Sequence, residues 1–121
     1  MNNYIKIFSF LFFSLLSSFL YSQTTMEIGY FSFNESSPNF TLSKGDGERT
    51  VSIEVRFTKQ FLTKPEIVFS VEGLDCSKDS NLRYSIETSV LTKESFLLVI
   101  KTWADTKIFS IKGKWVAITT D

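Results

Sequence analysis

Histidine is absent from the 121-residue sequence, which has one cysteine, two prolines and five glycines. Without histidine, the chain cannot form a triad with a histidine base or a zinc site with imidazole ligands. Glycine-rich phosphate-binding motifs and paired-cysteine motifs are also missing. Cys76 has no partner in its own chain, so it is either a free thiol or an intermolecular link. We therefore expect no metal and no cofactor.

Residues 1–22 have the pattern of a secretory signal peptide. Lys6 precedes an apolar run over residues 7–20, which is shorter than the about 20 residues that span a bilayer core. With cleavage after Ser22, we expect a mature domain over residues 23–121 that is secreted (extracellular or periplasmic) and not inserted in a membrane. An uncleaved anchor is the alternative. The mature chain has 12 basic and 13 acidic residues, so it lacks the basic excess of a nucleic-acid-binding domain.

The mature chain has the pattern of short strands. Apolar and polar residues alternate from Val51 to Phe57, as in a half-buried strand, and Pro65 suits the start of another. Residues 96–100 are apolar on both faces, which predicts a central strand, and Trp115 is expected in the core. Turn-forming residues gather over residues 34–38, 44–48, 74–81 and 92–95. We expect an all-β fold, a six-stranded antiparallel β-sandwich, with strands over residues 28–33, 51–58, 67–71, 84–88, 96–100 and 108–118.

Several short motifs follow one another in order between about Gly29 and Ile118. They are Phe57-x3-Phe61-x3-Pro65-x-Ile67, Leu74-Asp75, Asn81-Leu82-Arg83, Phe96, Thr102-Trp103-x-Asp105-Thr106-Lys107-Ile108-Phe109-Ser110 and Trp115-Val116-Ala117. This ordered set resembles the H-type lectin domain, the family of the N-acetylgalactosamine-binding agglutinins and of the C-terminal domains of discoidins. The resemblance implies a six-stranded antiparallel β-sandwich that assembles as a homotrimer, with a sugar site at each boundary between neighbouring subunits.

The resemblance also implies roles for particular residues. Trp103 would stack on the sugar, while Arg83 and the turn that holds Ala104 and Asp105 would provide hydrogen bonds. Asp46 matches an acidic residue that the neighbouring subunit contributes. A pyranose suits this mixture, because its C–H groups pack on an aromatic face and its hydroxyls take charge-assisted partners.

Two positions depart from the agglutinin pattern. Ala104 replaces a histidine and Phe109 replaces a tyrosine, so polar contacts to the sugar are lost at both. Discoidin-like members also have a small residue after the tryptophan, so sugar binding need not be lost with it. The departures put in doubt the preference for N-acetylgalactosamine over other galactose-type glycans. Asp105 or Lys107 would be the residues to take over a polar role.

Each candidate site residue has a structural alternative. A tryptophan at a strand end, such as Trp103, is often part of the core. Arg83 has the alternative of a solvated surface arginine. Asp46 lies between two glycines, where an aspartate favours a tight turn without any ligand.

Three functions remain open from the sequence. The leading one is a secreted, non-enzymatic lectin for galactose or N-acetylgalactosamine-type glycans, which works in recognition or adhesion. The second is a structural or protein-binding β-sandwich that has lost sugar binding, as Ala104 and Phe109 suggest. The third is a hydrolase that uses two carboxylates, for example Glu54 and Glu87, one with a raised pKa.

Overall fold

The computed structural model describes residues 24–120, and the expected signal peptide over residues 1–22 lies outside that range. The described chain forms six strands: β1 (Thr24–Asn34), β2 (Arg49–Arg56), β3 (Glu66–Cys76), β4 (Tyr84–Ser89), β5 (Ser95–Thr102) and β6 (Ile108–Thr120). Within residues 24–120 there is no helix long and apolar enough to cross a membrane. The predicted all-β fold of six antiparallel strands is confirmed.

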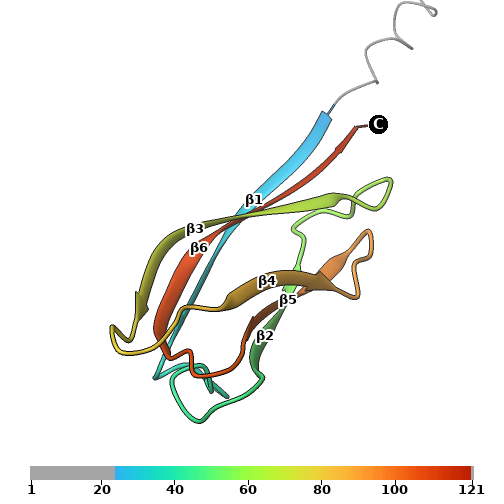
Figure 1. The fold of residues 1–121 in the computed structure, drawn as a ribbon. Coiled ribbons are helices and arrows are strands. Elements are labelled where there is room, and N and C mark those ends of the chain that lie inside the picture. The colour runs from blue at the N-terminus through green and yellow to red at the C-terminus, as the bar shows by residue number, and fades with distance from the viewer. Residues whose placement is uncertain (1–23, 121) are drawn as a thin grey trace, which may run out of the picture.

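The strands form two antiparallel three-stranded sheets, which make the two layers of a sandwich (Figure 1). Their orders are β1-β6-β3 and β2-β5-β4, so β6 and β5 are the central strands. The register pairs Thr24 of β1 with Thr120 of β6, which places both ends of the described chain together. Residues 35–48, 77–83 and 103–107 connect strands at the opposite end, which we call the loop end.

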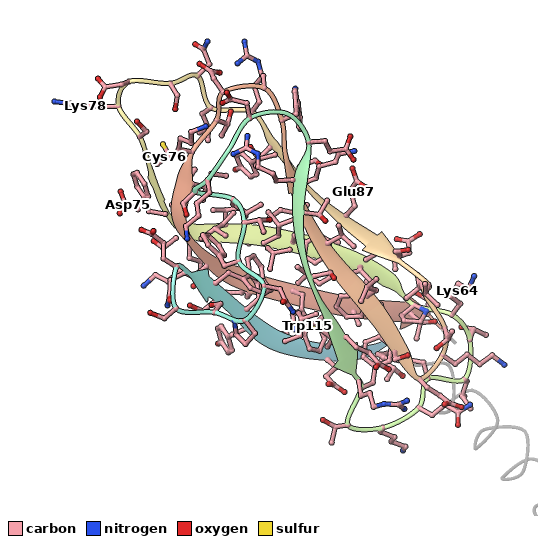
Figure 2. The ribbon with its side chains drawn as sticks, turned by 90° about the horizontal axis from the view of Figure 1, so that it is seen from below. Lys64, Asp75, Cys76, Lys78, Glu87 and Trp115 are labelled. Atoms are coloured by element: carbon pink, nitrogen blue, oxygen red, sulfur yellow. The ribbon has the colours of Figure 1, made fainter. Side chains whose placement is uncertain are left out.

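Aromatic rings fill the space between the sheets. The ring centroids of Phe96 and Trp115 are 5.4 Å apart, and Phe57 lies 5.7 Å from Phe96 and 6.0 Å from Trp115. Trp115 is only 5% exposed and lies between the layers in Figure 2, so its predicted place in the core is confirmed. Offset and edge-to-face ring pairs of this kind add about 0.5–1.5 kcal/mol each beyond the burial of their area.

The central position of β5 explains why its sequence is apolar on both faces. Phe96, Leu98 and Ile100 are buried toward the other sheet, whereas Leu97 and Val99 are half-buried on the outer face. A central strand has neighbours on both sides, which shield even its outward-facing side chains. The predicted central position of this strand is therefore confirmed.

Two local expectations were wrong. Residues 74–76 do not belong to a turn: β3 continues to Cys76 through register shifts at Val71/Gly73 and Asp75/Cys76. The first shift lets Leu74 pack against the core. Ile53 fits the alternating pattern but is 48% exposed, whereas Val51, two residues earlier on the same face of the edge strand β2, is 3% exposed.

Gly29 gives a test of the packing in the β1–β6 pair. It lies directly opposite Trp115, and an added Cβ would be 2.2 Å from Cζ2 of the indole ring. We expect Gly29→Ala to lower the free energy of unfolding by about 1–3 kcal/mol, as overpacking does, in a urea titration. Ser32→Ala, on the outer face of the same strand, is the control and should change it by less than about 0.5 kcal/mol. Equal stability of the two variants would contradict this packing.

Candidate functional site

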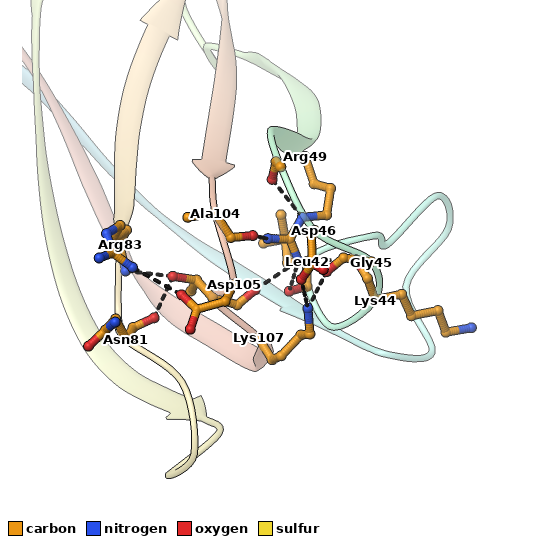
Figure 3. A network of polar contacts seen from close by, with 12 residues as sticks. Leu42, Lys44, Gly45, Asp46, Arg49, Asn81, Arg83, Ala104, Asp105 and Lys107 are labelled. Carbon is orange, nitrogen blue, oxygen red and sulfur yellow. Dashed lines mark hydrogen bonds and ion pairs between the residues drawn. The ribbon is translucent and has the colours of Figure 1, made fainter.

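Three segments of the loop end meet in one polar network (Figure 3). They are the turn between β5 and β6 at residues 103–107, the loop over residues 42–47 before β2, and residues 81–83 before β4. The network includes all the predicted site residues except Phe109 and the side chain of Trp103, whose positions are described below.

Two buried threonines join residues 81–83 to the turn. The Thr102 hydroxyl donates to the Arg83 carbonyl at 2.7 Å. The Thr106 hydroxyl donates to the Asn81 carbonyl at 2.5 Å and accepts from the Arg83 amide at 2.9 Å. Neither threonine has any exposed surface, so their hydroxyls are fully committed to these bonds. They fix the backbone of Arg83 beside the turn.

Arg83 and Asp105 form a partly exposed ion pair across this junction. Nη1 of Arg83 donates to Oδ1 of Asp105 at 3.0 Å. The contact uses one nitrogen and one oxygen, which leaves Nη2 of Arg83 and Oδ2 of Asp105 without a bond to any of residues 24–120. The pair thus retains both a donor and an acceptor for a ligand.

Arg49 joins the 42–47 loop to the turn through backbone carbonyls alone. Nε donates to Gly47 at 2.9 Å, Nη2 to Ala104 at 3.0 Å, and Nη1 to Thr106 at 2.8 Å. Nη1 also lies 3.0 Å from the Lys44 carbonyl and 3.5 Å from that of Leu42. The amide of Gly47 donates to the Ala104 carbonyl at 2.9 Å as a further link. Sequence reasoning missed Arg49, because an arginine before a strand resembles any surface cation.

Asp46 and Lys107 form a second ion pair, on the other side of the turn from Arg83 (Figure 3). Nζ of Lys107 lies 2.8 Å from Oδ1 of Asp46 and also donates to the Gly45 carbonyl. The hydrogen bond and charge of Lys107, with a smaller contribution from Arg49, lower the pKa of Asp46 below its ordinary 3.8. Asp46 is therefore ionised, and its Oδ2 has no bond to the described part of the chain.

Trp103 and Ala104 precede Asp105 and Lys107, the turn residues that form these two ion pairs. Trp103 is 39% exposed, in contrast to the buried Trp115, so the alternative of a core residue does not describe it. Ala104 has φ +57°, a left-handed conformation that non-glycine residues rarely adopt. Its carbonyl is held by both Gly47 and Arg49, which stabilises this conformation.

Phe109 lies at the start of β6 and is half-buried. The β3–β6 register passes from Ser110 to Ile108, so Phe109 is the residue without a partner at this irregularity. Within residues 24–120, no hydrogen bond or ring contact joins its side chain to the ion pairs of the turn. Phe109 thus differs from the other predicted site residues, which the fold brings together.

The carboxylates suggested for a hydrolase are not brought together. Glu54 lies on β2 opposite Leu97, and Glu87 lies on β4 opposite Val99, with β5 between them. Strand spacing puts their Cα atoms roughly 12 Å apart, and the two carboxylates have different partners, with Glu54 paired to Arg56 at 3.4 Å. Glu87 is also bound by Lys101 at 3.5 Å and by the Ser85 hydroxyl at 2.9 Å.

The match to a known family identifies the class of this β-sandwich. The sequence model of the H-type lectin domain matches residues 52–118, more than half of the chain, and the chain belongs to this family. Arg83, Trp103 and Asp105 lie inside the matched range, whereas Asp46 precedes it. The family and the fold point to a non-enzymatic protein.

Individual relatives extend this assignment. A discoidin-1 polypeptide of Dictyostelium discoideum is 29% identical over 80 residues, covering 65% of this chain and 32% of that protein. ATP synthase subunits region ORF 7 of Fuscovulum blasticum is 31% identical over 74 residues, covering 61% of this chain and 64% of that protein. The chain thus spans about a third of the length of the discoidin.

A solved structure has the same fold. Recombinant discoidin II of Dictyostelium discoideum aligns with a TM-score of 0.72 at 24% identity, over 84% of this chain and 39% of that one. The expected resemblance to the H-type lectin domain is confirmed by the family match, and the sandwich by the structural one. Together these relatives support a carbohydrate-binding lectin.

The pKa of Asp46 tests the Asp46–Lys107 pair. In an NMR titration of the carboxyl carbon, we expect Asp46 to titrate below pH 3.8 and to return toward that value in Lys107→Met. Because the pKa is lower in the folded state, the pair stabilises the fold above the ordinary pKa and ceases to do so as pH falls through the folded-state value. Lys112→Met, a lysine remote from Asp46, is the control and should leave the titration unchanged. A normal pKa in the unmodified protein would contradict the pair.

Proposed function

We propose that this protein is a secreted lectin that binds galactose or N-acetylgalactosamine-type glycans at sites shared between the subunits of a homotrimer. The observation that carries the proposal is the exposed ring of Trp103, which lies in a turn flanked by two ion pairs. Each ion pair is made through a single oxygen and a single nitrogen. The loop end therefore combines an apolar surface with side-chain donors and acceptors that have no hydrogen-bond partner within residues 24–120.

The chemistry of a pyranose fits these groups. The C–H face of the sugar would lie on Trp103, and its hydroxyls would bind Arg83, Asp105 and the ionised Asp46. Ala104 and Phe109 offer no polar side-chain atoms, so the site would rely on the ion pairs for its hydrogen bonds. This supports binding of galactose-type sugars without a strong requirement for the N-acetyl group.

The topology supports a site shared between subunits. Asp46 precedes β2 and Arg83 precedes β4, and these are the opposite edges of the β2-β5-β4 sheet. Subunits that turn this sheet toward a common three-fold axis would bring the β2 edge of one beside the β4 edge of the next. Leu97 and Val99, half-buried on the outer face of β5, would then pack near the axis.

Trp103 tests the sugar site. We expect Trp103→Ala to weaken sugar binding at least ten-fold, about 1–2 kcal/mol, because the stacking surface is lost. Its stability should stay near that of the unmodified protein, since the ring is exposed. Trp115→Ala is the control and should instead lose about 3–5 kcal/mol of stability. Calorimetry with N-acetylgalactosamine and urea unfolding measure the two effects. Unfolding of Trp103→Ala would show a core residue and remove the basis of the proposal.

Mixed trimers test the shared site. Asp46→Ala and Arg83→Ala proteins should each fail to bind, because each lacks a charge-assisted hydrogen bond to the same ligand. Refolded together in equal amounts, they should recover binding at about one interface in four, where an Arg83→Ala chain supplies Asp46 to its neighbour.

Light scattering and mass spectrometry give the assembly state in this experiment. A monomer at micromolar concentration would contradict the trimer. Confirmed mixed trimers with no recovered binding would place Asp46 and Arg83 in a site within one chain.

A structural or protein-binding module is the second candidate, and one observation favours it. Asp46 and Arg83 each already have an ion-pair partner in their own chain, as purely structural residues would. A glycan array separates the two candidates. Specific binding to galactose-type glycans supports the lectin, and binding to no glycan supports the module.

A further inference from the structure

A second polar hollow lies on the outer face of the β1-β6-β3 sheet, toward the loop end. Its volume is about 350 Å³, at the small end of the range for ligand pockets. Side chains from all three strands line it: Ser32, Asn34, Asp75, Ser110 and Lys112. Asp75 points outward in Figure 2, away from the interior that holds Trp115, while Glu87 lies on the other outer face.

The two irregularities of β3 create this hollow. Its register with β6 shifts between Val71 and Gly73 and again between Asp75 and Cys76. A Cβ on Gly73 would lie 2.7 Å from Cε of Lys112, so the lysine chain occupies the space that the missing side chain leaves. Bulges re-aim neighbouring side chains and are common beside functional sites. Here they present Asp75 on the outer face, opposite Ser110.

Apart from Asn34, whose Oδ1 accepts from the Ser36 amide at 2.8 Å, the polar side chains in the hollow are not used by the fold. Within residues 24–120, no hydrogen bond or ion pair engages the Asp75 carboxylate, the Lys112 ammonium or the hydroxyl groups of Ser32 and Ser110. By contrast, the next lysine along β6, Lys114, is bound to Glu72 at 3.1 Å. An acceptor, a cationic donor and two hydroxyls therefore lie together and unpaired.

An exposed aromatic ring lies on the same outer face, outside the set of residues that line the hollow. Tyr30 precedes Ser32 on the same face of β1 and is 73% exposed. Its ring centroid lies 5.9 Å from Nζ of Lys114, whose bond to Glu72 anchors the lysine. The ring thus has a defined neighbour while most of its surface remains open.

We infer that this hollow is a second sugar site, which binds a neutral pyranose with adjacent free hydroxyls. Asp75 accepts from two hydroxyls, Lys112 and the serines complete the hydrogen bonds, and Tyr30 contacts the C–H groups. A single carboxylate with a single ammonium gives no net attraction for a charged ligand, which favours a neutral one. The inference takes its ligand class from the proposed lectin function, but it uses none of the residues of the site at Trp103.

Amide NMR of the ¹⁵N-labelled protein tests the second site with methyl galactoside as the probe. We expect saturable shifts at Gly73, Asp75 and Ser110 with a millimolar dissociation constant. Asp75→Asn should weaken this binding at least ten-fold, and Tyr30→Ala should weaken it as well. Asp79→Asn, an exposed aspartate in the 77–83 loop, is the matched control and should leave it unchanged.

Further outcomes distinguish the second site, beside Asp75, from the site proposed at Trp103. Trp103→Ala should abolish shifts around Arg83 and retain those at Gly73. Shifts at Gly73 without any at Arg83 would refute the site at Trp103 and leave the second site standing. Absence of saturable shifts at Gly73 up to about 50 mM probe, a concentration well above a millimolar dissociation constant, would overturn the inference. Shifts at Gly73 that persist in Asp75→Asn would also overturn the inference. Tighter binding of galacturonate than of methyl galactoside would overturn it as well, because the site is inferred to prefer a neutral sugar.

Discussion

The loop end depends on one guanidinium group that binds only backbone carbonyls. Arg49 reaches carbonyls on both sides of the site, from Lys44 and Gly47 in one loop to Ala104 and Thr106 in the β5–β6 turn. These carbonyl oxygens belong to loop and turn backbone, which has no neighbouring strand to provide hydrogen-bond donors. An arginine can replace those donors, because its guanidinium group has five N–H donors in one plane. Because the same group holds both segments, Arg49 fixes the backbone of both the Asp46 loop and the Trp103 turn within one chain. A sugar site at the loop end would therefore use two surfaces that are already ordered without the sugar.

The same arrangement separates positioning residues from those that we propose to face the ligand. Thr102 and Thr106 are buried, and their hydroxyls form hydrogen bonds with the backbone of residues 81–83. The backbone of Arg83 is therefore held in place, which limits where its side chain can reach. Arg83 and Asp46 are themselves held by single contacts, to Asp105 and Lys107. A side chain held in this way has lost much of its rotamer freedom but retains an atom for a ligand. Such preorganisation lowers the entropic cost of binding.

The sequence predicts the strands well, because a period of two depends only on which face of a strand is buried. Val51, Phe57 and Trp115 are buried as that rule predicts, whereas Ile53 is exposed against it. The extension of β3 through Asp75 was not predictable, since Gly73 and Asp75 are turn-forming residues and only pairing with β6 keeps them in a strand. The role of Arg49 was not predictable for a related reason. Its partner Thr106 is 57 residues away in the sequence, and no local pattern indicates that the fold brings the two residues together.

The two proposed sugar sites follow from how few surfaces a small sandwich offers. With β5 and β6 central, each sheet has one face in the core and one outer face, and three loops gather at one end. A shallow site with a millimolar dissociation constant supplies only about −4 kcal/mol, so useful binding requires several sites on one particle. If the β2-β5-β4 sheet faces the three-fold axis, the hollow beside Asp75 faces outward on all three copies of the chain. A trimer would then present loop-end sites along one direction and face sites around its perimeter, which suits a branched glycan better than a linear one.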